Sequence, residues 1–533
     1  MCQAHRRSSE APRYNWTLDL THKHLTAHRN TALDGFISNT TIKTGGAILL
    51  LAVLFTAASV YESFHLSALA STDVWLPLRT GTWILQNHQV PHAGLFSQYS
   101  DSPWRAYSWG FDVLVASAYK VLGLAALPIL LMIYRAGLAV VLFWLACGWR
   151  GNFWPAVLLS AVAQYALISM PLQSLIGSVL LLSAELGILL FARESGDFRK
   201  LYWLPVLFAV WANLDVHVFF GLMVLIIFLG AELLEDLCRR LGVQSFQHGG
   251  QILTWTKTLT IVAGCVAATL LSLYGFHIYE AIPTLFRNGA LLPYIGELRS
   301  SGFRQPQDFV ILLLAMAAFF SLGRLHGRDL FKLLLMIFAA VVSFSVQRES
   351  WVVVVASVGV IGHIFRAERT APSSQHGIGP WRMVGLPTVG MVIAVLVTVA
   401  AVRIPRSHEA LLAYVGQGLP VKACQYIREH KLPEPLFNNY DWGGFLAWYL
   451  PEYPVAIDTR NDLYGDEVTL RYFKIARGEL PLSEELHFAY AGTVIVPKNS
   501  PLAVPLRAGP RFTPVYEDNV ALVAVRTALL EQK

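Results

Sequence analysis

Long apolar stretches recur through the first 402 residues, and they constrain the fold more than any other feature of this sequence. Several reach or approach the roughly 20 residues that an α-helix needs to cross a bilayer. Of the 533 residues, 55% are apolar and 14% are Asp, Glu, Lys or Arg, whereas about 25% are charged in a soluble domain. The mean hydropathy of +0.48 therefore reflects membrane helices. This composition excludes a soluble cytosolic enzyme and predicts an α-helical polytopic membrane protein.

Eleven membrane spans are predicted within residues 45–402, after a polar tail of residues 1–44 that lacks the apolar core of a signal peptide. The predicted spans are 45–61, 124–147, 154–170, 172–192, 201–214, 217–234, 258–275, 308–325, 330–346, 351–365 and 383–402. With the tail in the cytoplasm, the loops on its side carry thirteen Lys and Arg residues and the opposite loops carry seven. This asymmetry satisfies the positive-inside rule. An odd number of spans then places the C-terminus outside.

The segment 62–122 is too polar to span a membrane and is predicted to be the first outer loop. Within it, residues 75–85 and 109–122 have the apolar spacing of helices. Because Trp and Tyr favour the membrane surface, we expect both helices to lie at the interface and their aromatic residues to form a belt there.

The hydropathy falls after Arg403, and residues 403–533 are predicted to form a soluble α/β domain. Apolar strand candidates at 454–457 and 493–496 alternate with helical patterns at about 420–430 and 464–476. The topology places this domain on the periplasmic or extracellular face.

Several classes of function are excluded by what the sequence lacks. The net charge of +6 comes from basic residues spread over short loops, so no nucleic-acid partner is predicted. The five cysteines have wide, unrelated spacings, which favours neither a disulfide framework nor a zinc site. There is no P-loop, no HExxH and no GxSxG motif. We therefore predict no metal and no other cofactor.

Ionisable side chains concentrate in segments that this topology places outside. Such groups cost ~2.5 to 3.5 kcal/mol each at membrane depth, so their presence there suggests function. We predict that they share one cavity. The candidate site residues are Asp73, Asp215, His217, Arg348, Glu349, Asp458 and Arg460, joined by Arg135 inside the second span. Other polar residues on the outer side are Glu280, Glu297, Asn438, Asp441 and Asp462.

Each candidate also has a purely structural interpretation. Asp73, Asp215 and His217 could cap helices or turns. Arg348 and Glu349 could form a local ion pair, and Arg135 could extend to an interface. Asp458 and Arg460 are best interpreted as a pair that pins their own loop, and Asp441 with Gly443 and Gly444 as a helix cap and a close-packed turn.

A reaction on the outer face has no ATP supply, so its donor must arrive activated and held by the membrane, as polyprenyl-phosphate sugars are. One carboxylate would deprotonate an acceptor hydroxyl while a cation stabilises the departing phosphate. We assign the base to Asp73 and the phosphate contact to Arg348 or Arg135.

Blocks of sequence then support a family. The run from Asp73 to Leu85, followed by Val90-Pro91, Phe96-Ser97, Pro103-Trp104 and Trp109, resembles the first outer loop of bacterial C-type (GT-C) glycosyltransferase-like membrane proteins. Further similar blocks, in the same order, are Trp211 to His217, Leu273 to Gly275 with Ile278-Tyr279, Gln347-Arg348, Phe437 to Leu446 and Ile457 to Tyr464. The resemblance covers most of residues 45–525.

The resemblance implies a GT-C core in residues 45–402, a first outer loop that supplies the catalytic carboxylate, and an undecaprenyl-phosphate-linked sugar as donor. It implies the inner (plasma) membrane of a bacterium, and the lipid bilayer and a glycan or protein acceptor as partners. The sequence departs from the family pattern at Leu76-Pro77, Gly94 and Tyr107-Ser108, where polar residues are often found. These departures favour a metal-independent site.

Three functions follow from these patterns. The first is an outward-facing hexosyl- or pentosyltransferase. The second, favoured by the departures in the first outer loop, is a non-catalytic scaffold for glycan assembly. The third is a lipid or glycan transporter, for which Arg135 and Asp215 would line a path; paired halves with interrupted helices, which many transporters have, are not found in the sequence.

Overall fold

The computed structural model describes residues 46–148, 153–241, 255–282, 291, 293–324, 329–367, 379–481 and 486–531. The chain divides into two compact units, Met1–Leu51 and Ala52–Lys533. Of the first unit, only residues 46–51 are described, as the start of the helix Gly46–His65. The second unit contains every candidate site residue.

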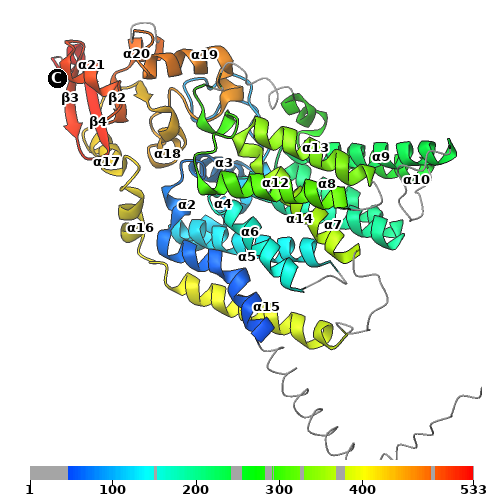
Figure 1. Ribbon diagram of the computed structural model, residues 1–533. Coiled ribbons are helices and arrows are strands. Elements are labelled where there is room, and N and C mark those ends of the chain that lie inside the picture. The colour runs from blue at the N-terminus through cyan, green and yellow to red at the C-terminus, as the bar shows by residue number, and fades with distance from the viewer. Residues whose placement is uncertain are drawn as a thin grey trace, which may run out of the picture. The chain divides into compact units, whose positions relative to one another are not determined.

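Most of the second unit is helical, as the apolar runs predict (Figure 1). After Gly46–His65, the helices are α2 (Ser67–Ala70), α3 (Trp75–Asn87), α4 (Trp109–Leu122), α5 (Ala126–Cys147), α6 (Phe153–Ala166), α7 (Leu175–Ser195), α8 (Leu204–Leu214), α9 (Val218–Arg240), α10 (Trp255–Thr269), α12 (Pro306–Arg324), α13 (Leu330–Ser345), α14 (Ser350–Ala367) and α15 (Gly379–Val402). A helix thus coincides with every predicted span. Within the described residues, five helical segments are long and apolar enough to cross a membrane, namely Gly46–His65, Trp109–Cys147, Leu175–Ser195, Val218–Cys238 and Pro306–Arg324.

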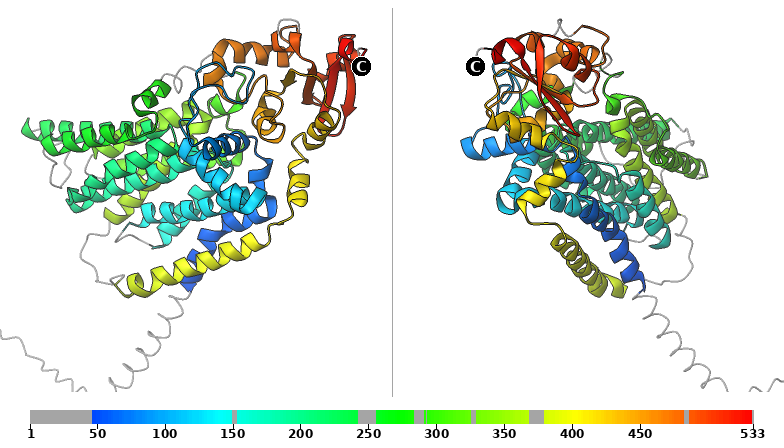
Figure 2. Two further views of the ribbon diagram at one scale, coloured as in Figure 1. Left: turned by 180° about the vertical axis from the view of Figure 1, so that it is seen from behind. Right: turned by 90° about the vertical axis from the view of Figure 1, so that its left-hand side faces the viewer.

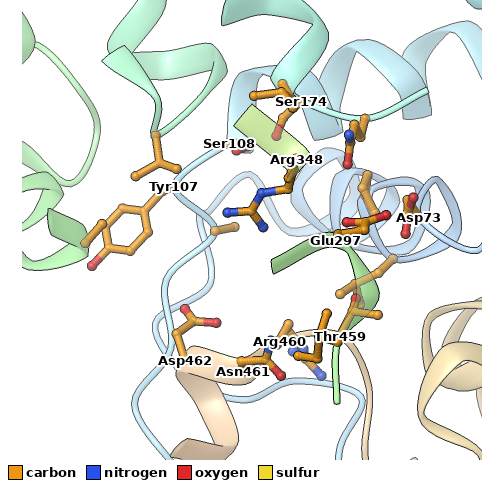
Figure 3. A pocket seen from close by; sticks show the side chains of 18 of the residues that line it. Asp73, Tyr107, Ser108, Ser174, Glu297, Arg348, Thr459, Arg460, Asn461 and Asp462 are labelled. Carbon is orange, nitrogen blue, oxygen red and sulfur yellow. The ribbon is translucent and has the colours of Figure 1, made fainter. Parts of the chain in front are cut away.

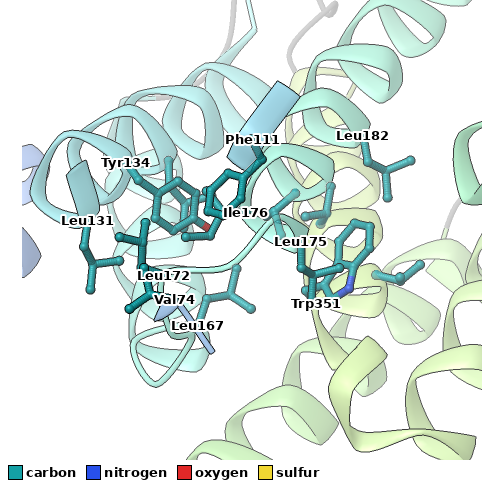
Figure 4. Packing of buried hydrophobic residues seen from close by; sticks show 14 of the residues in the cluster. Val74, Phe111, Leu131, Tyr134, Leu167, Leu172, Leu175, Ile176, Leu182 and Trp351 are labelled. Atoms are coloured by element: carbon teal, nitrogen blue, oxygen red, sulfur yellow. The ribbon is translucent and has the colours of Figure 1, made fainter. Parts of the chain in front are cut away.

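Helix α14 packs against five other helices, α5, α6, α7, α12 and α13. Figure 2 shows this helical part of the protein from two further sides. In α14, the side chains from Trp351 to Val355 are completely buried, as expected for a helix that is apolar on all sides. Gly362 permits a close approach to α5, because a Cβ there would lie 2.5 Å from the carbonyl oxygen of Ala146. Figure 4 shows Trp351 in the core near Leu175 and Leu182 of α7.

The first outer loop contains the two predicted helices, and Trp75 at the start of the first of them is buried inside the protein. Helices α3 and α4 pack closely, because a Cβ at Gly81 would lie 1.9 Å from the carbonyl oxygen of Asp112. Trp75 is 0% exposed, and its ring lies 5.3 Å from that of Phe445 and 4.7 Å from that of Trp448. The interfacial interpretation is therefore wrong for Trp75. The C-terminal region covers this side chain, so it cannot face lipid.

The C-terminal region carries a four-stranded sheet of order β1-β2-β4-β3. Strand β1 (Leu436–Asn438) is parallel to β2 (Thr493–Pro497), while β4 (Ala521–Arg526) is antiparallel to both β2 and β3 (Phe512–Glu517). The helices of this region are α16 (His408–Val415), α17 (Val421–Glu429), α18 (Gly443–Tyr449), α19 (Asn461–Ala476), α20 (Leu486–Tyr490), α21 (Ala503–Ala508) and α22 (Thr527–Leu530). Strand β2 confirms the strand predicted at 493–496. Helices α17 and α19 confirm the helical patterns predicted at about 420–430 and 464–476.

The predicted strand at 454–457 is wrong. Only Val455 pairs, in an isolated bridge to Ser97 of the first outer loop. The backbone N–H of Val455 donates to the carbonyl of Phe96 at 3.0 Å, and the N–H of Gln98 donates to that of Val455 at 2.9 Å. The segment is therefore buried between this loop and the sheet, where the side chain of Asn438 in β1 accepts from the N–H of Ala456 at 2.8 Å and donates to the carbonyl of Ile457 at 2.8 Å. The contact with the loop holds the C-terminal region beside the first outer loop.

Candidate functional site

A cavity of about 820 Å³ is enclosed by segments that are far apart in sequence (Figure 3). Its walls come from the start of α3, the loop at residues 103–108, the α8–α9 junction, the turn before α14 and the segment 459–466 that begins α19. Five of the predicted site residues line it: Asp73, Asp215, His217, Arg348 and Arg460. Glu349 lies directly behind Arg348, while Asp458 contacts Arg460.

Asp73 lies at the end of the turn that precedes α3 and is half-buried. Its carboxylate accepts long hydrogen bonds from the hydroxyls of Thr72, at 3.4 Å, and Ser71, at 3.5 Å. Helix α3 has no side-chain cap, so Asp73 does not have the capping role that the sequence allowed. Burial raises the pKa of the Asp73 carboxyl above its ordinary value, although the two hydroxyls and the charge of Arg348 act in the opposite direction.

Arg348 is presented by the short turn Gln347–Glu349 between α13 and α14. Ser343 fixes this turn, because its hydroxyl donates to the carbonyl of Glu349 at 2.8 Å and accepts from the N–H of Val353 at 3.0 Å. The Nε of Arg348 donates to Oε1 of Glu349 at 3.1 Å, as the ion-pair interpretation expects.

The rest of the Arg348 guanidinium faces the cavity. The side chain is 29% exposed and points into the hollow between Ser108 and Asp462 in Figure 3. In the part of the chain that the structure describes, its Nη1 and Nη2 have no hydrogen-bond partner. Two charged donors are thus available to an anion.

Behind Arg348, a histidine joins two buried carboxylates. His217 Nδ1 lies 2.6 Å from Oδ2 of Asp215, and Nε2 lies 3.2 Å from Oε1 of Glu349. Asp215 also accepts from the hydroxyls of Ser174, at 2.8 Å, and Ser178, at 2.5 Å. The two carboxylates, and the imidazole between them, are at most 6% exposed. The structure thus brings these three predicted site residues together, and the backbone N–H of His217 also donates to Asp215 in a local turn.

Arg460 and Asp458 form a buried bidentate pair with N–O distances of 2.9 and 2.6 Å. Arg460 also donates to the carbonyl of Leu95 at 2.9 Å, and its guanidinium lies 4.7 Å from the ring centre of Trp104. This geometry fits the interpretation of a pair that pins its loop. It leaves Arg460 less able than Arg348 to bind an added anion.

Arg135 is not among the residues that line the cavity. It is 7% exposed within α5, where it donates to Glu62 at 3.1 Å and to the carbonyl of Ile168 at 3.0 Å. The alternative that gave Arg135 the phosphate contact therefore needs correction. Its charge is already neutralised by a buried carboxylate that the sequence analysis did not consider.

The cavity also contains carboxylates that were outside the predicted site. Glu297, Asp441 and Asp462 were noted as outer polar residues, and Asp112 of α4 was missed. Asp112 is 5% exposed, and its carboxylate has no hydrogen bond to the described residues. The sequence position of Asp112 could have indicated that it lines the cavity. Asp112 follows Ser108, another lining residue, by four positions, so the two lie on the same side of the start of α4.

These acids alter one another's pKa values. Glu297 and Asp441 have pKa values raised by the loss of surrounding water and by the charge of Asp73. The side chain of Asp462 is exposed to the cavity, but the surrounding protein replaces much of the bulk water around it. This loss of water raises the pKa of Asp462 to about 6. Among the described residues, no three His, Cys, Asp or Glu side chains are grouped so as to hold a metal ion.

The structural interpretation of the segment 439–444 is correct in part. Asn439, not Asp441, caps this turn by accepting from the N–H of Asp441 at 3.0 Å. Gly443 is closely packed as predicted, because a Cβ there would lie 2.3 Å from the carbonyl oxygen of Ile457. Asp441 is consequently exposed and faces the cavity.

Comparisons with known proteins support the fold. No protein-family model matches the chain, and no curated protein matches it. The structure is similar to the archaeal oligosaccharyltransferase AglB from Archaeoglobus fulgidus in complex with an inhibitory peptide and a dolichol-phosphate, with a TM-score of 0.50 and 11% identity. That match covers 86% of this chain and 70% of the archaeal chain.

Two structures of ArnT from Cupriavidus metallidurans, one bound to undecaprenyl phosphate and one in the apo state, are also similar. Their TM-scores are 0.47 and 0.46, at 12% and 13% identity. The matches cover 90% and 92% of this chain and 98% and 99% of the ArnT chains. The likeness to the archaeal structure shows that this chain shares the fold of that protein over most of its length.

Proposed function

We propose that this multi-pass membrane protein transfers a sugar from a polyprenyl-phosphate donor to a cell-envelope acceptor. In this proposal residues 1–44 are a cytoplasmic tail, residues 45–402 span the inner membrane of a bacterium eleven times, and residues 403–533 form an extracytoplasmic α/β domain. The fold shared with a solved oligosaccharyltransferase that binds dolichol-phosphate supports this class of donor. A reporter fused after Lys533 tests the orientation, because it should be active only outside the cytoplasm.

A single observation carries the proposal: Asp73 and Arg348 line one cavity, and the Nη1 and Nη2 atoms of Arg348 have no hydrogen bond to the described residues. A guanidinium with two available donors suits a phosphate oxygen pair. Asp73 is electrostatically coupled to Arg348. A reacting sugar can therefore lie between a cation that holds its phosphate and a carboxylate that faces its anomeric carbon.

The proposed reaction follows from these two groups. Asp73 accepts the proton of an acceptor hydroxyl as the hydroxyl oxygen forms a bond to the anomeric carbon. The bond from that carbon to the phosphate oxygen breaks, and its electron pair leaves on the polyprenyl phosphate, which Arg348 stabilises. Burial makes Asp73 a stronger base than an exposed aspartate.

The remaining carboxylates suggest a class of acceptor. Glu297, Asp441 and Asp462 are exposed to the cavity that Asp73 also lines, and Asp462 lies across it from Asp73 (Figure 3). Carboxylates accept hydrogen bonds from hydroxyls and repel a second anion. We therefore propose a hydroxyl-rich acceptor, such as a glycan, and not an acidic one.

The test is transfer by the purified protein in lipid nanodiscs, supplied with undecaprenyl-phosphate hexoses and pentoses and a cell-envelope glycan fraction. We expect Asp73→Asn to lower turnover by about 10²- to 10⁴-fold. The matched control is Asp101→Asn, an exposed aspartate of the same outer loop that does not line the cavity. Equal turnover in the two variants would remove Asp73 from the mechanism.

A second candidate function is a non-catalytic binder of lipid-linked glycan. It is favoured by Leu76 and Pro77, which line the cavity where the family often has polar residues. This protein would bind undecaprenyl phosphate in the same nanodiscs but release no sugar from any donor. The transporter alternative has no supporting contact among the described residues, because Arg135 is paired with Glu62 and does not reach the cavity.

A further inference from the structure

The histidine behind the cavity has a geometry that determines its charge. The Nδ1 and Nε2 atoms of His217 each lie within hydrogen-bond distance of a carboxylate oxygen, at 2.6 and 3.2 Å. A neutral imidazole has one N–H and can donate to only one of them. An ionised carboxylate only accepts, so a histidine that bonds to two such groups carries both protons and a positive charge.

The alternative, a neutral histidine with one protonated acid, is disfavoured by the other partners of the two carboxylates. Asp215 accepts from Ser174 and Ser178, and Glu349 accepts from Arg348 Nε and from Trp351 Nε1, both at 3.1 Å. Each of these donors stabilises the ionised form. Asp215, His217, Glu349 and Arg348 therefore form a row of alternating charges.

This row connects rigid helices to the exposed cation. Asp215 is fixed by Ser174, which precedes α7, and by Ser178 of α7, and Trp351, the partner of Glu349, is 0% exposed in α14. Asp215 and His217 also line the cavity, but Arg348, at the end of the row, has the most exposed side chain of the four residues. Glu349 holds the Nε side of the guanidinium, so the direction in which Nη1 and Nη2 point depends on where Glu349 is held.

We infer that His217 is a positioning residue: its imidazolium holds Glu349 in place so that Arg348 presents two free donors to the phosphate of a lipid-linked substrate. This inference rests on the proposed function. Without His217, Asp215 and Glu349 are neighbouring buried anions, and Glu349 moves toward other donors and takes the guanidinium with it. His217 acts through Arg348 and needs no contact with the substrate.

The experiment measures binding of undecaprenyl phosphate to the full-length protein in nanodiscs. We expect His217→Asn to raise the Kd about tenfold, the effect of losing one charge-assisted hydrogen bond. Arg348→Ala should raise it at least as much. The double variant should bind no more weakly than Arg348→Ala alone, because the histidine has no effect once its target is removed.

A matched control and a second variant keep the result interpretable. His363 is a buried histidine of α14, roughly 21 Å along the helix from Glu349, and it bonds to Lys332 at 2.8 Å. His363→Asn should change thermal stability without changing the Kd. Glu349→Gln breaks the row from its other side and should reproduce the effect of His217→Asn, also without adding to Arg348→Ala.

The outcomes separate this inference from the function that it rests on. If the wild-type protein does not bind the lipid phosphate, or if Arg348→Ala binds it normally, the proposed function fails and the inference fails with it. If Arg348→Ala weakens binding but His217→Asn and Glu349→Gln do not, only the inference is overturned. Effects of His217→Asn that add fully to Arg348→Ala, or that His363→Asn matches, would likewise overturn it.

Discussion

Helices α7, α9, α13 and α14 carry clusters of charged residues near both of their ends, and the two clusters differ in one respect. At the cavity, the row ends in Arg348, which is 29% exposed and has donors available. At the other end, Arg193 bonds to Glu232 and Glu235 at 2.6 and 2.9 Å. That second cluster is closed by Asp329, Lys332 and His363, each at most 8% exposed.

The comparison teaches that burial and pairing do not by themselves identify a functional site. Buried charges are costly wherever they occur, and both clusters offset the cost with opposite charges and hydrogen bonds. Of the two clusters, the one at Arg348 combines charged donors that have no hydrogen-bond partner among the described residues with a cavity large enough for a substrate. We therefore interpret the cluster at Arg193 as a structural connection between four helices and the cluster at Arg348 as a binding site.

The largest effect is expected from Arg193→Met. This change leaves Glu232 and Glu235 without their cation in a buried environment, which costs about 3–5 kcal/mol of stability. Thermal unfolding in detergent measures the loss, and lipid-phosphate binding by the remaining folded protein should be unchanged. A stable variant that no longer binds the lipid would show that this cluster belongs to the functional site.

The same substitution at the other end should have the opposite pattern. Arg348→Met removes the phosphate contact and should lower turnover by about 10²- to 10³-fold, the effect of losing one charge-stabilising donor. The unfolding temperature should fall less than in Arg193→Met, because Arg348 is partly solvated. Steady-state kinetics with the lipid-linked donor measures the effect. Unimpaired turnover would contradict the difference between the clusters.

A smaller effect concerns the carboxylates that the cavity leaves without a cation. The pKa of Asp462 is raised to about 6, so its charged form is disfavoured in the folded protein. The free energy of unfolding therefore contains a contribution from protonated Asp462 that is fully present at pH values below 3.8, its ordinary pKa. This contribution is lost as the pH rises through about 6. Asp462→Asn cannot ionise, so its unfolding temperature relative to the wild type should increase between pH 4 and pH 7. A constant difference over this range would show that the site does not disfavour the charge.

The smallest effect is expected where charges are paired but not buried. Arg471 and Glu467 lie one helical turn apart on α19, at 3.0 Å, with side chains 43% and 86% exposed. Such pairs contribute about 0.3–0.5 kcal/mol, so Arg471→Ala should shift the unfolding temperature only slightly and leave turnover unchanged. A loss comparable to that of Arg193→Met would undermine the use of burial to rank these pairs.

The helices were predictable because a long apolar helix is encoded locally. Each needs a continuous apolar run, and the runs within α7 and α14 mark those helices without knowledge of their neighbours. The error at 454–457 has the opposite cause. A short apolar run indicates burial but does not reveal the partners, which are the backbone around Ser97 and the side chain of Asn438.

The residue types of the site and its local pairs, Arg348 with Glu349 and Asp458 with Arg460, agree with the sequence analysis, but the pairings between distant segments were not predictable. Asp73 and Arg348 were identified as unusual charges on the outer side, yet Arg135 has the same type of signal and is bound to Glu62 instead. Arg193 and Lys332 lie near the ends of predicted spans and are buried in the closed cluster. Each of these differences depends on contacts between distant segments, which a single sequence does not encode locally.

The most direct test of the central claim is an experimental structure of the full-length protein in a nanodisc with undecaprenyl phosphate bound. The account predicts that the lipid phosphate lies within hydrogen-bond distance of the Nη atoms of Arg348, in the cavity that Asp73 lines. A phosphate bound elsewhere, or Asp73 and Arg348 found in separate cavities, would contradict the account.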